Sequence, residues 1–166
     1  MPAELLIRPE RVSSKPLVFK GTLAVDDLPR VREVVASSAG ELRYEVAARR
    51  EPQGRKVVSC IIEGFVFLTC QTSLEEFRHG ISIDDRLVLV EREADLPPIE
   101  EESDAEDYMV ADGPLAVLDL VEDAVLLALP MVPRKPGLEQ PQDERPRAGT
   151  RDSPFAALAT LRKRPE

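Results

Sequence analysis

The chain has 166 residues, of which 43% are hydrophobic and 4% aromatic, and a formal net charge of −9. This length suits one domain with an aliphatic core, and the acidic charge argues against strong binding to free nucleic acid, whose phosphates an acidic surface repels. The start, MPAELLIRPE, lacks a basic stretch followed by a long apolar run, and no apolar run reaches about 18 residues. We therefore expect no signal peptide, no membrane span and a cytoplasmic location.

The N-terminal part of the chain predicts a strand followed by a short helix. Residues 16–25 read as the strand, and Asp26 or Asp27 is the expected N-cap of the helix. Apolar residues at helical spacing extend over 28–35, with Pro29 in the first turn, where proline is tolerated. The pattern therefore predicts a strand and helix before the main sheet.

The central part predicts an antiparallel sheet. Alternating or β-branched apolar residues indicate strands over 42–48, 56–70, 74–83 and 86–91. Residues 49–55 contain proline and glycine and predict a hairpin turn, Gly64 predicts a bend or bulge, and Asp84-Asp85 predicts a second turn. The fold class expected is α+β, an antiparallel meander carrying a short N-terminal helix.

The C-terminal half divides by composition. Residues 94–107 form an acidic, proline-containing stretch that we expect to be a mobile loop within a domain spanning 1–133. An apolar helix is predicted from Leu115, buried on most sides and ending at Pro130. Residues 134–152 predict a disordered linker, and 153–164 a tail helix.

Charge is distributed unevenly along the sequence. Between Glu91 and Asp123 there are thirteen acids and one base, Arg92, whereas the first 90 residues hold 13 charges of each sign. An acidic segment of this kind favours a basic protein partner.

Two charged clusters are candidate contact surfaces. Asp119, Glu122 and Asp123 are spaced to share one helix face, which could dock a partner or simply be the solvated side of the helix; as a metal site it lacks further ligands. The tail ends with three bases that could contact RNA phosphate or stabilise a helix C-terminus: Arg162, Lys163 and Arg164.

No residue set predicts catalysis or a cofactor. Cys60 and Cys70 are too far apart along one strand for a disulfide, and Cys60 is expected in the core. His79, the one histidine, has no nucleophile at a recognisable spacing. We therefore expect a protein that is not an enzyme and holds no metal.

Three sequence blocks resemble the YceD family, the large ribosomal RNA subunit accumulation proteins. They are the strand ending at Cys70-Gln71, where members commonly carry C-x-x-C; the V-E-D block at 121–123 followed by L-L-A-L-P-M-V-P, which includes Pro130 and Pro133; and the tail block that begins Pro154-Phe155. The resemblance spans roughly residues 57–164. It implies a role in large-subunit rRNA accumulation and supplies no catalytic residues.

One departure from the family pattern concerns metal binding. The C-x-x-C position reads Cys70-Gln71-Thr72-Ser73 here, and the cysteines that many members carry after the second proline are replaced by Arg134-Lys135-Pro136-Gly137-Leu138. Four thiolates could hold zinc, but one cannot. If relatives join the strand end to the helix exit through metal, this chain is expected to use apolar packing instead.

The resulting hypothesis is a non-enzymatic ribosome-biogenesis factor that supports accumulation of 23S rRNA through a ribosomal protein or a pre-ribosomal particle. Two alternatives remain open. One is a general acidic adaptor unrelated to ribosomes, and the other is a small hydrolase that uses carboxylates.

Overall fold

The computed structural model describes residues 5–98 and 106–137. It contains two units, Met1–Lys135 and Pro136–Glu166, and every element below belongs to the first. The tail helix predicted over 153–164 and most of the predicted linker lie outside the described residues.

A five-stranded sheet forms the centre of the first unit, in the order β2-β3-β4-β5-β6. Its strands are β2 (Leu17–Ala24), β3 (Ser37–Arg50), β4 (Lys56–Thr69), β5 (Glu76–Val90) and β6 (Asp107–Val110). The first four strands pair antiparallel in chain order, which confirms the predicted meander, whereas β6 pairs parallel with β5. The sheet is therefore mixed at one edge.

The predicted turn at Asp84-Asp85 is wrong. Both residues lie inside β5, where Asp84 pairs with Ile61 and Asp85 pairs with Cys60 of β4. Two acids are tolerated in the middle of this strand because Asp84 is exposed and Asp85 is only partly buried. The long ladder with β4 outweighs the turn preference of aspartate, since β5 pairs with β4 without interruption from Glu76 to Leu89.

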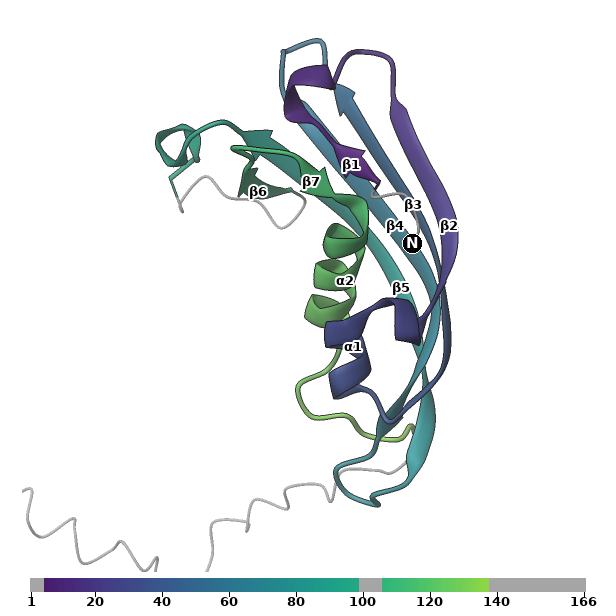
Figure 1. Ribbon diagram of the computed structural model, residues 1–166. Coiled ribbons are helices and arrows are strands. Elements are labelled where there is room, and N and C mark those ends of the chain that lie inside the picture. Colours follow the sequence, from purple (N-terminus) through teal and green to yellow (C-terminus); the bar gives the residue numbers. More distant parts are fainter. Residues whose placement is uncertain (1–4, 99–105, 138–166) are drawn as a thin grey trace, which may run out of the picture. The chain divides into compact units, whose positions relative to one another are not determined.

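Two helices pack on one face of the sheet (Figure 1): α1 (Pro29–Val34) and α2 (Val117–Ala128). The α2 helix ends two residues before Pro130, as predicted, and it is preceded by β7 (Leu115–Ala116), which pairs with β1 (Leu6–Ile7). The described residues of this unit also form three short 3-10 turns, η1 (Pro9–Arg11), η2 (Val25–Asp27) and η3 (Glu93–Asp95). No helix among the described residues is both long and apolar enough to cross a membrane.

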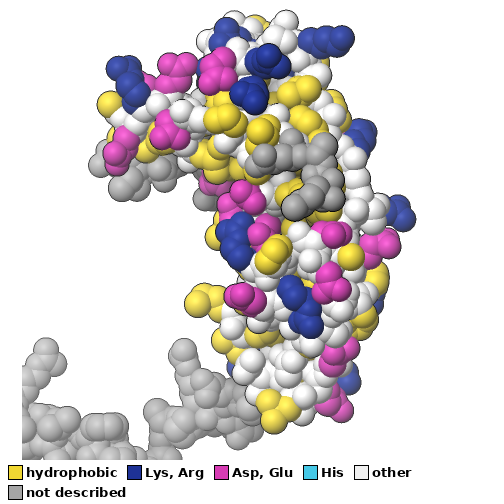
Figure 2. Space-filling model, in the orientation of Figure 1, with side chains coloured by type: hydrophobic (Ala, Val, Ile, Leu, Met, Phe, Trp, Pro, Cys, Tyr) yellow, Lys and Arg dark blue, Asp and Glu magenta, His cyan; other side chains and the backbone are white. Residues whose placement is uncertain are grey.

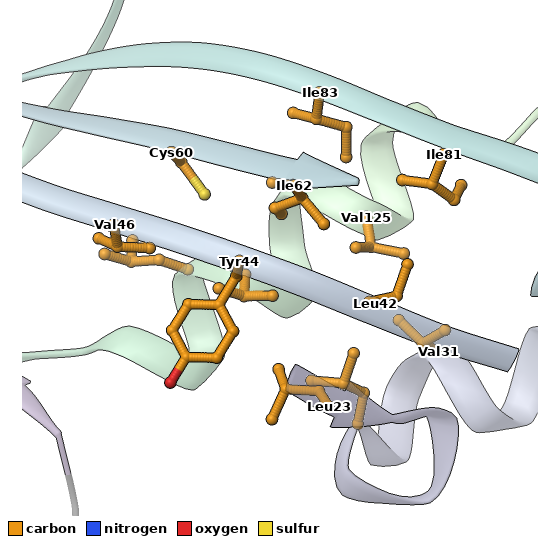
Figure 3. Close-up of a cluster of buried hydrophobic side chains, with 14 of the residues drawn as sticks. Leu23, Val31, Leu42, Tyr44, Val46, Cys60, Ile62, Ile81, Ile83 and Val125 are labelled. Atoms are coloured by element: carbon orange, nitrogen blue, oxygen red, sulfur yellow. The ribbon is translucent and has the colours of Figure 1, made fainter. Parts of the chain in front are cut away.

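The core is aliphatic, as the composition suggests. Inward-facing residues of β2, β3, β4 and β5 meet apolar residues of the two helices, and Figure 3 labels ten members of this core: Leu23, Val31, Leu42, Tyr44, Val46, Cys60, Ile62, Ile81, Ile83 and Val125. Burying such side chains contributes about 1.5–3 kcal/mol each before the cost of ordering the chain. This core holds α2 against β4 and β5.

The sheet is irregular near Gly64. The register between β3 and β4 shifts between Ser37 and Glu41, opposite Phe67 and Phe65, so β3 carries extra residues beside Gly64. Gly64 itself has φ +155° and approaches the backbone of Glu41. The sequence placed an irregularity at this glycine, and the structure places the extra residues on the neighbouring strand.

An ion-pair network fixes the start of β6. Glu51 accepts hydrogen bonds from Arg86 at 2.5 Å and Arg55 at 2.8 Å, and Glu106 accepts from Arg86 at 2.7 Å and Arg55 at 2.9 Å. These contacts join the β3–β4 turn, β5 and the residue before β6. They anchor one end of the acidic stretch, of which residues 99–105 lie outside the described part.

Candidate functional site

An apolar cleft of about 450 Å³ lies between α2 and the sheet edge formed by β5 and β6. Its lining is largely aliphatic: Cys60, Leu87, Met109, Leu120, Ala124, Leu126 and Leu127. Although the sequence pattern placed the leucines of this helix in the core, Leu127 is 85% exposed. The last turn of α2 therefore presents apolar surface that the domain does not bury.

Three carboxylates line the same cleft, Asp85, Asp107 and Asp123. Burial raises the pKa of Asp85, and the negative charges of Asp107 and Asp84 raise it further. Asp123 is paired with Arg30 at 2.6 Å, but Asp85 and Asp107 form no salt bridge with any residue that the structure describes. Acidic and hydrophobic side chains lie next to one another on the side where α2 and β6 lie (Figure 2). The cleft is therefore suited to a cation attached to an apolar group.

Glu122 is engaged inside the domain. The α1 helix starts after Leu28, whose side chain cannot cap it, and Glu122 supplies the cap from α2. Its Oε1 accepts the backbone N–H groups of Arg30 at 2.5 Å and Val31 at 3.2 Å, and its Oε2 accepts Arg30 Nε at 2.8 Å. Burial opposes ionisation of Glu122, but these hydrogen bonds outweigh it and lower its pKa.

The cap of α1 differs from the sequence prediction. Asp26 and Asp27 belong to η2, and the carboxylate of Asp27 accepts the backbone N–H of Ala24 at 2.9 Å. The predicted short helix and its early Pro29 are present, but the acid that caps it comes from a distant part of the chain.

The exposed acidic surface therefore differs from the predicted one, in which Asp119, Glu122 and Asp123 shared one face of the helix. Glu122 is 5% exposed and cannot reach a partner, Asp119 is exposed, and Asp123 lines the cleft. Asp85 and Asp107, which sequence reasoning missed, supply the unpaired charges. The sequence did contain a signal that Asp85 lies in a strand: the apolar residues on either side of it are numerous enough to form one continuous strand.

The Cys70 thiol lies at the end of β4 and is buried. Hydrogen bonds to its Sγ come from the Ser73 side chain and from the backbone N–H groups of Lys135, Ser73 and Thr72; against the effect of burial they lower its pKa to about 6. Hydrogen bonds of this kind favour the thiolate form.

The segment that follows β4, beginning at Cys70, is joined to the segment that follows α2 by polar contacts. The N–H of Gln71 donates to the carbonyl of Pro133 at 2.9 Å, and Lys135 Nζ donates to Glu75 at 3.0 Å. The expectation of apolar packing at this junction is corrected, since hydrogen bonds and an ion pair join the two segments.

The remaining residues singled out in the sequence lie outside the acidic cleft's rim or outside the described part of the chain. Cys60 is buried in the core, and burial followed by the charge of Asp85 raises its pKa to about 11. His79 lies in β5 with its ring edge-on to Phe77. Within residues 5–98 and 106–137, no group of three metal-ligating side chains converges. Five candidates lie outside the described residues: Pro154, Phe155, Arg162, Lys163 and Arg164.

Comparison with known proteins identifies the family. The family model described as large ribosomal RNA subunit accumulation protein YceD matches residues 58–162, more than half of the chain. No solved structure matches the chain. The match includes most of β4 and all of β5, β6 and α2, and therefore all the cleft residues; β2, β3 and α1 precede it.

Proposed function

Because the chain belongs to the YceD family, whose members are large ribosomal RNA subunit accumulation proteins, we propose that it is a non-enzymatic ribosome-biogenesis factor that binds a basic ribosomal protein. Family membership implies a role in large-subunit rRNA accumulation, and the family is not known as a family of enzymes. The proposal adds a means of action, which is recognition of a basic, amphipathic protein segment during assembly of the particle that contains 23S rRNA.

The observation that supports this proposal is the apolar cleft with an acidic rim. Proteins that bind rRNA carry exposed lysine and arginine, because these side chains neutralise phosphates. Before such a protein reaches its RNA, its cations can pair with Asp85 and Asp107 while an adjacent apolar side chain enters the cleft. An amphipathic segment laid into a groove is a common mode of peptide recognition.

The size of the cleft sets the scale of binding. A volume of about 450 Å³ accommodates a few side chains rather than a whole domain. Each apolar side chain buried contributes about 1.5–3 kcal/mol, and each rim ion pair up to about 1 kcal/mol. After the cost of association, an affinity in the micromolar range is expected, which is appropriate for a factor that must later release its partner.

Two exposed residues allow a direct test. Asp107→Lys reverses a rim charge, and Leu127→Ser removes an apolar anchor; both side chains are exposed, so folding should be little changed. Titrating the full-length double variant against individually purified large-subunit ribosomal proteins should show about 10-fold or greater weakening for the protein bound best by the parent chain. The measurement is fluorescence anisotropy or calorimetry at low and physiological salt.

Asp84→Lys is the matched control. It makes the same charge change one residue from Asp85, on an exposed side chain that does not line the cleft. This variant should retain the parent affinity within about twofold. Equal weakening by Asp84→Lys would mean that net charge alone controls binding, and failure of every ribosomal protein to bind the parent chain would contradict the proposed function.

A further inference from the structure

Basic side chains gather at one end of the sheet, around a second cleft of about 520 Å³. The cleft is lined by Leu6, Arg8, Arg11, Ser13, Lys15, Pro16, Leu17 and Phe19. The backbone N–H of Arg50 donates to the carbonyl of Ser13 at 2.8 Å, which places the end of β3 beside this segment. Figure 2 shows Lys and Arg side chains concentrated at this upper end, near β1. We refer to Arg8, Arg11, Lys15, Arg49 and Arg50 as the basic end.

The charges of the basic end are largely unneutralised. Arg8, Arg11, Lys15 and Arg50 form no salt bridge among the described residues. Arg49 lies 3.9 Å from Glu51.

Two of the described acids, Glu10 and Glu51, lie close in sequence to these bases, and together they can offset at most two of the five charges. The carboxylate of Glu51 is already held by Arg55 and Arg86. Glu10 is an exposed residue of η1. At least three positive charges therefore remain available to an anion.

The acids of the first cleft do not cancel this field either. Leu17 on β2 and Asp107 on β6 lie on opposite edges of the five-stranded sheet, four strand spacings or about 19 Å apart. Arg49 and Arg50 lie on β3, three strand spacings or about 14 Å from β6. The Debye length is about 8 Å at physiological salt, so the two charged regions act independently. The net charge of −9 is an average over surfaces of opposite sign.

We propose that the basic end binds the phosphate backbone of RNA, so that the protein holds RNA at one edge of the sheet and a basic protein at the other. Arginine suits phosphate because its planar donors can bind two oxygens at once. The partly exposed Leu17 and Phe19 add an apolar floor that can contact sugar or base. The choice of RNA over another anion rests on the proposed function. The basic end itself precedes the range matched by the family model.

The proposal is tested with the full-length protein and a fluorescein-labelled single-stranded RNA of about 20 nucleotides. If each of the five cations contacts one phosphate, log affinity should fall with log salt at a slope of about −3.5. The variant R8Q/R11Q/K15Q should bind at least about 10-fold more weakly at low salt, and its slope should become shallower by about 2.

The control carries the same loss of charge elsewhere. R32Q/R43Q/R78Q removes three exposed arginines that do not line the basic cleft, and its affinity should stay within about threefold of the parent. Equal weakening in the two triple variants, or none in either, would overturn the proposal. So would polyglutamate that competes as well as RNA at equal charge, because the surface would then recognise anions in general.

The two binding proposals can fail separately. R8Q/R11Q/K15Q should still bind the ribosomal protein recognised by the acidic cleft, and the Asp107→Lys, Leu127→Ser variant should still bind RNA. RNA binding without protein binding would contradict the proposed function while leaving the basic end intact. Protein binding without RNA binding would contradict the proposal for the basic end and leave the proposed function intact.

Discussion

Glu122→Ala is expected to lower the free energy of unfolding by about 2 kcal/mol. The substitution removes the cap of α1, leaves the backbone N–H groups of Arg30 and Val31 without an acceptor, and unpairs the Arg30 guanidinium. The loss is smaller than for a fully buried ion pair because Arg30 is half exposed and water can solvate it. Urea denaturation followed by circular dichroism measures the change.

Asp119→Ala is the control for this prediction. Asp119 is an exposed acid on the same helix, one turn earlier, so its removal should change stability by less than about 0.5 kcal/mol. Equal stability of the Glu122→Ala and Asp119→Ala proteins would show that the carboxylate of Glu122 does not hold α1 to α2.

The contribution of Glu122 should also depend on pH. Its pKa is lower in the folded protein than in the unfolded chain, so the folded state binds the proton more weakly. The stabilisation is complete above the unfolded value of about 4.3 and is lost as pH falls through the folded value. The stability difference between the parent chain and Glu122→Gln should therefore narrow in acid; a difference that widens below pH 4 would contradict this account.

Gly64→Ala is expected to lower the free energy of unfolding by about 3 kcal/mol. A Cβ at this position would overlap the carbonyl oxygen of Glu41 and approach the Cα of Leu42 to 2.9 Å, and φ is +155°. Both groups belong to the backbone of β3 and cannot move without disturbing the ladder, so steric and dihedral strain add. The consequence reaches the functional site, since β4 supports the cleft through Cys60.

Gly80→Ala provides a matched comparison. Gly80 lies in β5 directly opposite Phe65, has no positive φ, and a Cβ there would meet nothing within 4 Å. Alanine at this exposed strand position should be neutral or slightly stabilising, because it restricts the unfolded chain. The prediction for Gly64 is contradicted if both variants unfold at the same urea concentration.

Local pattern was sufficient for the elements whose apolar spacing repeats. The strands around Val46 and Ile62 and the α2 helix follow their apolar periodicity, and the turn at Pro52 and Gly54 follows from residue preference. Asp85 was assigned to a turn because aspartate prefers turns. The sequence did not show that Asp85 pairs with Cys60 of β4, and this pairing keeps it in a strand.

Long-range pairing explains what the sequence did not predict. The cap of α1 joins residues 92 positions apart, from Arg30 to Glu122, and no local signal connects them. The same reason applies to the parallel β6 and to the basic end, where a backbone hydrogen bond joins Ser13 to Arg50. Charge counted along the chain could not show that opposite charges separate in space.

The most direct test of the central claim is the ratio of large-subunit to small-subunit rRNA in a strain lacking this gene, complemented with the parent chain or a variant at equal protein level. The cleft variant Asp107→Lys, Leu127→Ser should fail to restore the ratio, whereas the Asp84→Lys protein should restore it fully. Full restoration by a cleft variant that no longer binds the ribosomal protein in vitro would contradict the proposal that this cleft supports rRNA accumulation.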